Sequence, residues 1–475
     1  MNIVLSMLLY VVSQAVAVAQ PSGAALTLNV EKCRQMALDS SEDVRKGNNT
    51  LAQSALDRKI AVSAFLPAVE ASGSVMYMTP NMEMSGMEMI MKGTYMAGIM
   101  LTQPIYAGGK ILTGKKMAEI GKDAAVERLR MAKASVIYDA DNAYWTYVAV
   151  MQKQAMMDAL AAQLDTLFSQ IGVASSAGMA TDADLLTVKA KRSEVEYQAR
   201  KVANGVAMCK MALCRVVGVP FDTEIEVEDI AAPKEFTRME TNDVSVTDRP
   251  EMKLLETSLK VSRLQVRMTR GDYLPTLALV GGYCPYGNIK MKTMVDAGGG
   301  NYVPYTQKIG QDMGVAMLSL SIPIFKWGQG NNKIRKAKLD VDNAALDLQK
   351  NGRLLELQAR QAAFNLSDSY NLIEAAMDGK AQADENLRVT ENRYHASMCP
   401  LSDYLDAQFQ WQQARSNLIE AFTQSRIAET DYLMATGHLV DETVFAKQRD
   451  GSDQRTAYRI YPCLIRSSLD LTGNV

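Results

Sequence analysis

The stretch Arg393-Tyr-His-Ala-Ser-Met-Cys-Pro-Leu-Ser-Asp-Tyr-Leu-Asp406 predicts the point where one long helix ends, the chain reverses and a second helix begins. Pro400 suits an early position of the second helix, because the N–H that proline lacks is not needed there. Ser402 and Asp403 add polar groups that complement the exposed N–H donors and the positive end of the helix dipole. We therefore expect two long helices joined by this reversal.

The same pattern occurs 219 residues upstream, as Ala177-Gly-Met-Ala-Thr-Asp-Ala-Asp184. The offset aligns further pairs without a gap: Pro104 with Pro323, Gly109 with Gly328, Trp145 with Phe364, Asp184 with Asp403 and Gly218 with Gly437. The Leu-Pro pair at 66–67 matches the pair at 274–275 only if the second half carries 11 extra residues, which we expect in a loop. Two copies of this length indicate a duplicated domain rather than a solenoid.

The predicted division of the chain follows from this offset. Residues 1–19 read as a signal peptide, because an apolar run ends in Ala17-Val-Ala19; the alternative is a buried N-terminal segment, since no Lys or Arg precedes the run. The parts that follow are a first repeat (20–218), a linker (219–246) with a short strand expected around Glu224-Ile-Glu-Val-Glu228, a second repeat (247–438) and a C-terminal tail (439–475).

Composition narrows the class of protein. A chain of 475 residues that is 48% hydrophobic is not disordered. It contains 51 Lys and Arg against 53 Asp and Glu, which gives a net charge of −2. No nucleic-acid partner is therefore expected. Six cysteines are scattered without a disulfide framework.

Each half contains two segments in which apolar side chains alternate with small or polar ones. They span 69–77 and 94–102 in the first half, and 277–283 and 317–322 in the second. Strands of about ten residues cross a bilayer when tilted. We expect Val75, Ile99, Leu279 and Leu320 to face lipid, and Ser72, Thr102 and Ser319 to face water.

The rest of each half has helical periodicity. Helices are predicted over 26–64, 110–173 and 182–217, and again over 243–272, 330–396 and 401–436. The second of these would extend for roughly 96 Å, so it must pack lengthwise against other helices.

This order of elements resembles the TolC-like family of outer-membrane efflux proteins. The residues that carry the resemblance are Gln103-Pro-Ile-Tyr-Ala-Gly-Gly109 with its echo Ile322-Pro-Ile-Phe-Lys-Trp-Gly328, the two Leu-Pro pairs and the two helix reversals. The resemblance implies an α+β membrane protein. It would be a trimeric β-barrel with four strands per protomer, continued by a long α-helical coiled-coil barrel and built from two internal repeats.

The resemblance also implies a function. The protein would be a homotrimer in outer-membrane lipid with its helical tunnel in the periplasm, and would passively conduct substrates from an inner-membrane pump and a periplasmic adaptor to the outside. It would be a channel of an efflux or secretion system and no enzyme. The competing class is a soluble coiled-coil scaffold in which the alternating segments are ordinary hairpins.

The opening stretch holds the candidate site. By the resemblance, Asp403 and Asp406 match an acidic pair that lines the constriction at the periplasmic end of the tunnel, and Tyr394 and Asp184 match members of its closing network. Thr187 replaces the first-repeat counterpart of Asp406. Cys399 replaces a basic residue of that network. The alternative is a helix N-terminus that simply favours acids.

Two further features of the sequence relate to other chemistry. Gly109-x4-Gly114-Lys115 nearly matches a phosphate-binding loop, but Lys116 stands where Ser or Thr should follow. Two histidines, His395 and His438, exclude a His-rich metal site. No cofactor and no metal site are therefore predicted.

Nine methionines lie between Met76 and Met100. Thioethers favour Cu(I), so the outer-membrane component of a Cu(I) or Ag(I) efflux system is an alternative function. The simpler interpretation is that methionine fills a flexible hairpin tip.

Overall fold

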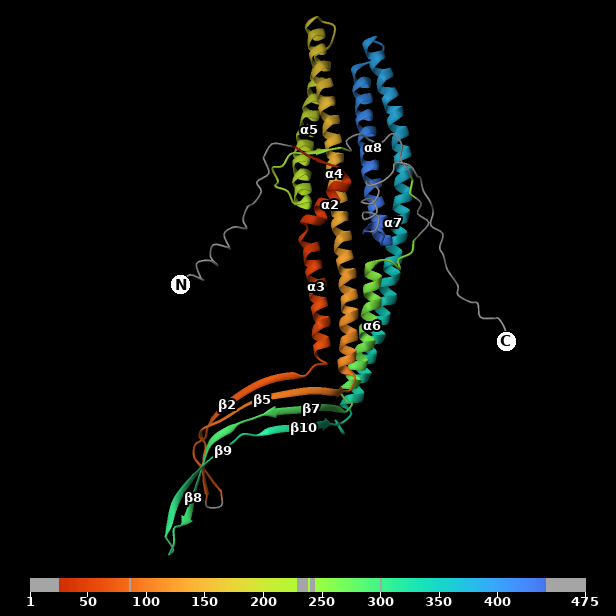
Figure 1. Cartoon of the computed structure of the whole chain (residues 1–475). Coiled ribbons are helices and arrows are strands. Elements are labelled where there is room, and N and C mark those ends of the chain that lie inside the picture. The colour runs from red at the N-terminus through yellow and green to blue at the C-terminus, as the bar shows by residue number, and fades with distance from the viewer. Residues whose placement is uncertain (1–24, 85–86, 229–237, 240–243, 300, 441–475) are drawn as a thin grey trace, which may run out of the picture.

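A computed structural model describes residues 25–84, 87–228, 238–239, 244–299 and 301–440. Its helices are α2 (Val30–Ser40), α3 (Glu42–Ser63), α4 (Lys110–Ser176), α5 (Asp182–Val217), α6 (Pro250–Gly271), α7 (Gln329–His395) and α8 (Leu401–Thr436). Its strands are β1 (Leu26–Leu28), β2 (Ala68–Tyr77), β3 (Met82–Met84), β4 (Met87–Ile90), β5 (Lys92–Ala107), β6 (Ile225–Val227), β7 (Thr276–Tyr283), β8 (Tyr286–Asp296), β9 (Tyr302–Gln311) and β10 (Gly314–Ser321). The helices form one elongated bundle, and a sheet bends away from one end of it (Figure 1).

Two helices set the length of the bundle. α4 and α7 have 67 residues each, which corresponds to roughly 100 Å. Each turns back into a partner of 36 residues, α5 or α8, while α3 and α6 pack beside the lower parts of α4 and α7 (Figure 1). Among the described residues, no helix combines the length and apolar character needed to span a bilayer.

The helix ends follow local signals that the sequence contains. The predicted helices 182–217 and 401–436 are confirmed, and Gly218 and Gly437 end them in the left-handed conformation that glycine adopts without strain. Pro400, predicted as an early helical residue, is instead the N-cap of α8. α4 ends at Ser176, three residues after the predicted end at 173. α7 ends at His395, one residue before the predicted end at 396.

Two predicted helices were wrong at their starts. The segment 26–64 begins with the short strand β1, and Ser41 then divides it into α2 and α3 by accepting hydrogen bonds from the N–H groups of Asp43 and Val44. The helix predicted from 243 begins only at Pro250, because proline disfavours helical geometry at the residue before it. Arg249 accordingly has extended backbone angles.

The middle of the bundle contains a core that joins segments far apart in the chain. β1 pairs in parallel with β6, which confirms the short strand expected in the linker. This two-stranded sheet packs on α2, α4 and α5 through side chains that include Leu28, Tyr144 and Leu213, all inaccessible to solvent.

An ion pair with a buried carboxylate lies beside this core. The Arg34 guanidinium donates from Nε and from one terminal nitrogen to the two carboxylate oxygens of Asp141, each at 2.6 Å, and Thr430 Oγ1 donates to Asp141 at 2.7 Å. Asp141 is 1% exposed. Burial, reinforced by this negative charge, raises the pKa of the nearby Cys33 thiol to about 12, so the thiol stays protonated.

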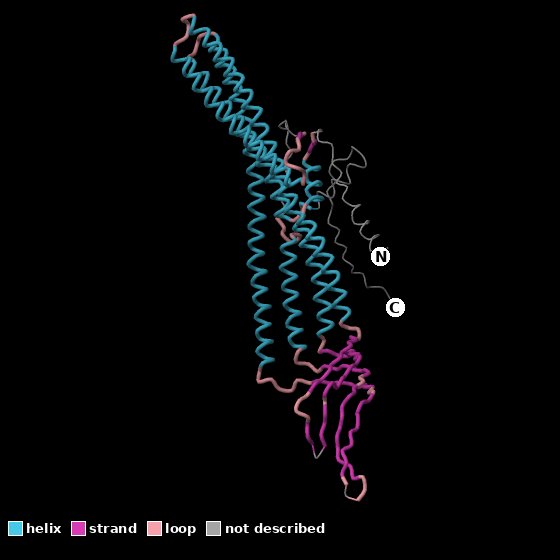
Figure 2. Tube along the Cα trace, turned by 90° about the vertical axis from the view of Figure 1, so that its left-hand side faces the viewer, coloured by secondary structure: helices cyan, strands magenta, loops and turns pink. Residues whose placement is uncertain are grey.

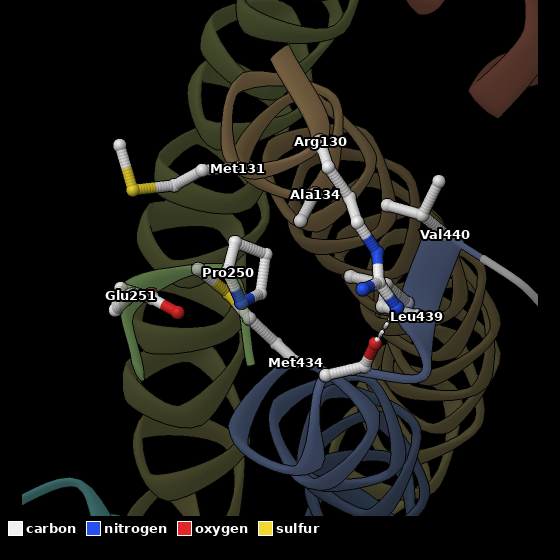
Figure 3. A pocket seen from close by; sticks show the side chains of 9 residues that line it. Arg130, Met131, Ala134, Pro250, Glu251, Met434, Leu439 and Val440 are labelled. Atoms are coloured by element: carbon white, nitrogen blue, oxygen red, sulfur yellow. Dashed lines mark hydrogen bonds between the residues drawn. The ribbon is translucent and has the colours of Figure 1, made fainter. Parts of the chain in front are cut away.

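A second polar junction ties the end of α8 to α4. Arg130 donates to the carbonyl oxygen of Gly437 at 2.7 Å (Figure 3). It also donates to the carbonyl oxygen of Asp248 at 3.0 Å. The hollow beside Arg130, lined also by Met434 and Leu439, measures about 10 Å³, which is room for at most one water molecule.

The main sheet has the strand order β2-β5-β7-β10, and all its pairs are antiparallel. Directly opposite residues in such pairs share a face. The register therefore shows which residues share a face across all four strands. Ala71 lies opposite Ile99, Gln103 opposite Leu279, and Leu277 opposite Leu320. One face thus carries Val75, Ile99, Leu279 and Leu320. The same register places Ser72, Thr102 and Ser319 on the other face, so the predicted division of the sheet into two faces is confirmed.

The distal part of the sheet differs from the prediction of two strands per half. β7 continues into β8 and β9 returns into β10, so the 11-residue insertion expected in a loop lies within a region of extended strands. The methionine-rich loop forms the β3–β4 hairpin, which pairs with β8. β4 and β8 lie about 200 residues apart in the chain. The alternation of apolar and polar residues within one strand does not show which distant strand it pairs with.

A close approach of two glycines joins sheet and bundle. Gly108, at φ +62°, lies after β5, and a Cβ there would collide with the carbonyl oxygen of Gly271 at the end of α6.

Of the predicted parts of the chain, the signal peptide lies outside the described residues, as do positions 441–475 of the tail.

Candidate functional site

The two helix reversals lie together at the end of the bundle remote from the sheet (Figure 2). Gly178 and Ser397 occupy the same left-handed position of the two turns, and both turns close with matching backbone bonds: Met179 N–H donates to Ala174, and Met398 N–H donates to Arg393. One apolar cluster joins the first hairpin to the start of α8. Its buried members are Leu160, Leu164, Leu167, Ile171, Val188, Val195, Leu401, Tyr404 and Leu405.

Asp184 is held by the cap of α5. Its carboxylate accepts from the hydroxyl of Thr181 at 2.7 Å and from the Thr181 N–H at 3.1 Å, while the Thr181 hydroxyl accepts from the Asp184 N–H. These hydrogen bonds, the side-chain one first, hold the pKa of Asp184 below its usual range. The carboxylate therefore stays charged at the tip of the first hairpin.

Tyr394 stacks on Tyr404, with ring centroids 5.3 Å apart and planes inclined by 5°. Burial raises the pKa of Tyr394, and the negative charge of Asp184 raises it further. The structure thus brings Asp184 of the first hairpin near Tyr394 of the second. Tyr404 is the residue that sequence reasoning missed; the signal available was an aromatic side chain directly after Asp403.

Asp403 and Asp406 lie on the exposed face of α8, three residues apart and therefore on neighbouring turns of the same side. Tyr404 and Leu405 between them are buried, so the helix turns its acids to solvent and its apolar stripe to the bundle. Asp403 accepts a hydrogen bond from the Ser402 hydroxyl at 3.3 Å. Of the four predicted site residues, Asp184 and Tyr394 are thus brought together, and the other two form an exposed acidic pair.

Cys399 and His395 at the tip contact neighbouring residues of the bundle. The Cys399 thiol donates to the Thr390 carbonyl at 3.6 Å, and the His395 ring lies 5.9 Å from that of Tyr394. Across the part of the chain that the structure describes, no group of three or more His, Cys, Asp or Glu side chains is placed to hold a metal ion.

The phosphate-loop-like segment is part of a helix. Gly109 is the N-cap of α4, and Gly114 and Lys115 lie within the helix that begins at Lys110. Its backbone N–H groups after the first turn are therefore used in helical hydrogen bonds and cannot surround a phosphate.

One larger groove, of about 430 Å³, lies between α4 and α6 near the sheet. Its lining is mostly charged, with both signs present, and consists of Lys116, Glu119, Ile120, Asp123, Lys260, Arg263, Leu264 and Arg267. Small-molecule sites are mainly apolar with a few polar groups, so this open groove does not have the character of a substrate pocket.

Comparison with known proteins extends these observations. The family model described as outer membrane efflux protein matches residues 33–218 and 245–438. The chain is 23% identical over 426 residues to outer membrane protein TolC of Escherichia coli (strain K12), covering 85% of this chain and 83% of that protein. It is 24% identical over 273 residues to alkaline protease secretion protein AprF of Pseudomonas aeruginosa, covering 55% of this chain and 51% of that protein.

A solved structure shares the fold. The CmeC outer membrane channel of Campylobacter jejuni superimposes with a TM-score of 0.69 at 18% identity, covering 92% of this chain and 94% of that one.

Proposed function

Since the chain belongs to the outer membrane efflux protein family, we propose that it forms the outer-membrane channel of a tripartite efflux or secretion system. It lies in the outer membrane and conducts substrates passively to the outside. Similarity to a secretion protein, AprF, supports including secretion beside efflux.

The observation that carries the proposal is the exposed apolar face of the sheet. Val75 is 77% exposed, Ile99 58% and Leu320 60%, on a face that the register makes continuous across four strands. Such a face would be unstable in water, but it matches hydrocarbon. We therefore assign this face to outer-membrane lipid and the face with Ser72 and Ser319 to the water-filled interior.

The two edges of the sheet support closure with further copies, which we propose form a homotrimer. Within the described residues, β2 pairs only with β5 and β10 only with β7. Each backbone group left unpaired in hydrocarbon costs roughly several kcal/mol. Closure with further copies, β10 of one against β2 of the next, removes both edges and gives a barrel with four strands per protomer.

The helices support a tunnel built from two repeats. The equal lengths of α4 and α7, and of α5 and α8, fit a first repeat at 20–218 and a second at 247–438, joined by the linker at 219–246. Three copies of this bundle would enclose a tunnel that extends through the periplasm toward an adaptor and an inner-membrane pump. The pump supplies the free energy of transport, and the channel has no catalytic step.

Fractionation tests the function. The proposal predicts a heat-modifiable oligomer in the detergent-extracted outer membrane of the producing cell. Recovery of the protein in the soluble fraction would overturn it and favour the coiled-coil scaffold.

We place the narrowest part of the tunnel at the helical tip. Copies of Asp403 and Asp406 around a threefold axis would form a ring of like charges that attracts cations. Replacing both by Asn is expected to lower cation selectivity and to weaken block by multivalent cations in planar bilayers, with assembly intact. Asp43→Asn, an acid in the first turn of α3 far from the tip, is the matched control and should change neither. An unchanged reversal potential and unchanged block in the double variant would leave the two acids as helix-end residues.

A further inference from the structure

Three methionines from three different strands form a row at the distal end of the sheet. Met82 of β3 lies directly opposite Met89 of β4, and Met89 lies directly opposite Met291 of β8. Residues so opposed project from the same face with Cβ atoms roughly 4.5–5.5 Å apart. Met87, two positions before Met89 on β4, is on the same face. The row joins residues about 200 positions apart in the chain.

These methionines do not fill a core. Met82 is 44% exposed and Met87 37% exposed, while Met89 and Met291 are half-buried. A thioether used only to fill gaps would be enclosed by other side chains. The row is instead open to solvent at one side, which leaves its sulfur atoms accessible to a small ion.

The charged side chains of this hairpin occupy the opposite face. Glu83 lies opposite Glu88, and Glu88 lies opposite Lys292. The Glu88 carboxylate accepts from Asn81 Nδ2 at 2.6 Å and pairs with the Lys292 ammonium at 3.6 Å. Carboxylate oxygens, which suit Mg²⁺ and Ca²⁺, are thus engaged away from the methionine row.

We propose that Met82, Met89 and Met291 bind one soft monovalent cation, Cu(I) or Ag(I). Each sulfur lies two bonds beyond its Cβ on a flexible chain, so the outer two can approach the central one and ligate a single ion. Thioether ligands select Cu(I) over the harder divalent ions, and Met87 can supply a fourth sulfur. The site goes beyond the proposed function, because its geometry does not depend on what the channel conducts.

The test is an anaerobic titration of the detergent-purified protein with Cu(I), in competition with a chromophoric Cu(I) chelator. The variant Met82→Leu/Met89→Leu/Met291→Leu keeps side-chain bulk and removes the sulfurs. The control, Met76→Leu/Met96→Leu/Met317→Leu, removes three methionines of the same sheet that do not lie in the row. Cysteine thiols bind Cu(I) equally in all three proteins, so the difference reports the thioethers alone.

We expect the row variant to bind about one equivalent of Cu(I) less than the wild type, with the control unchanged. Equal stoichiometry in the wild type and the row variant, or the same loss in the control, would overturn the proposal. Far-UV circular dichroism and oligomer mobility, unchanged in all three, show that folding is not the cause. Fractionation of the protein tests the channel separately, so either proposal can fail without the other.

Discussion

Replacing Asp141 by leucine is expected to lower the free energy of unfolding by about 3 kcal/mol, the lower end of the range for a buried ion pair, because Asp141 is buried whereas the Arg34 side chain is 24% exposed and can be partly solvated. The Arg34 guanidinium would keep its place beside the core without the carboxylate that now accepts two of its hydrogen bonds. Thr430 would lose its acceptor on the same side chain. Urea unfolding of the purified protein, followed by far-UV circular dichroism, measures the change.

A second variant separates the lost charge from the lost packing. Arg34→Met combined with Asp141→Leu removes both charges of this pair, and apolar replacement of a whole ion pair in a low-dielectric site is often close to neutral. We expect it to recover most of the stability lost in Asp141→Leu. Glu196→Ala, which breaks the exposed pair with Arg200, should leave the midpoint unchanged. A double variant less stable than Asp141→Leu would contradict this account.

The second large effect is expected in the sheet. Ile99→Arg should reduce the stability of the assembled protein in lipid by about 2 to 4 kcal/mol if this position lies near the bilayer midplane. Ile99 is paired with Ala71 and lies on the apolar face. An arginine there would bring its charge into hydrocarbon or force the strand to distort. The measurement is the urea dependence of folding into lipid vesicles, read by the heat-modifiable mobility of the oligomer.

Ser72→Arg is the matched control, because Ser72 is the next residue after Ala71 and so lies at nearly the same depth on the opposite face. There the side chain would extend from the face that we propose lines the water-filled interior, and assembly should be retained. Equal losses in the two variants would show that the two faces of the sheet do not differ in environment.

The sequence by itself determined the elements whose signals are local. Gly218 and Gly437 end their helices where predicted because left-handed backbone suits glycine, and the alternation around Val75 and Ile99 placed these residues on the correct common face. The matching reversals at Gly178 and Ser397 followed from the 219-residue offset. Each of these features depends on the conformation of a few consecutive residues.

Tertiary structure alone decided which distant segments meet. The relative placement of elements sets the pairing of β1 with β6 and the row of Met82, Met89 and Met291. It also brings the charge of Asp184 close enough to raise the pKa of Tyr394. A periodic pattern shows which face of a strand or helix is apolar, but the same pattern is compatible with many partners and registers. The choice among them is made by packing and hydrogen bonding over the whole chain, where long-range pairs satisfy backbone groups that no local pattern can satisfy.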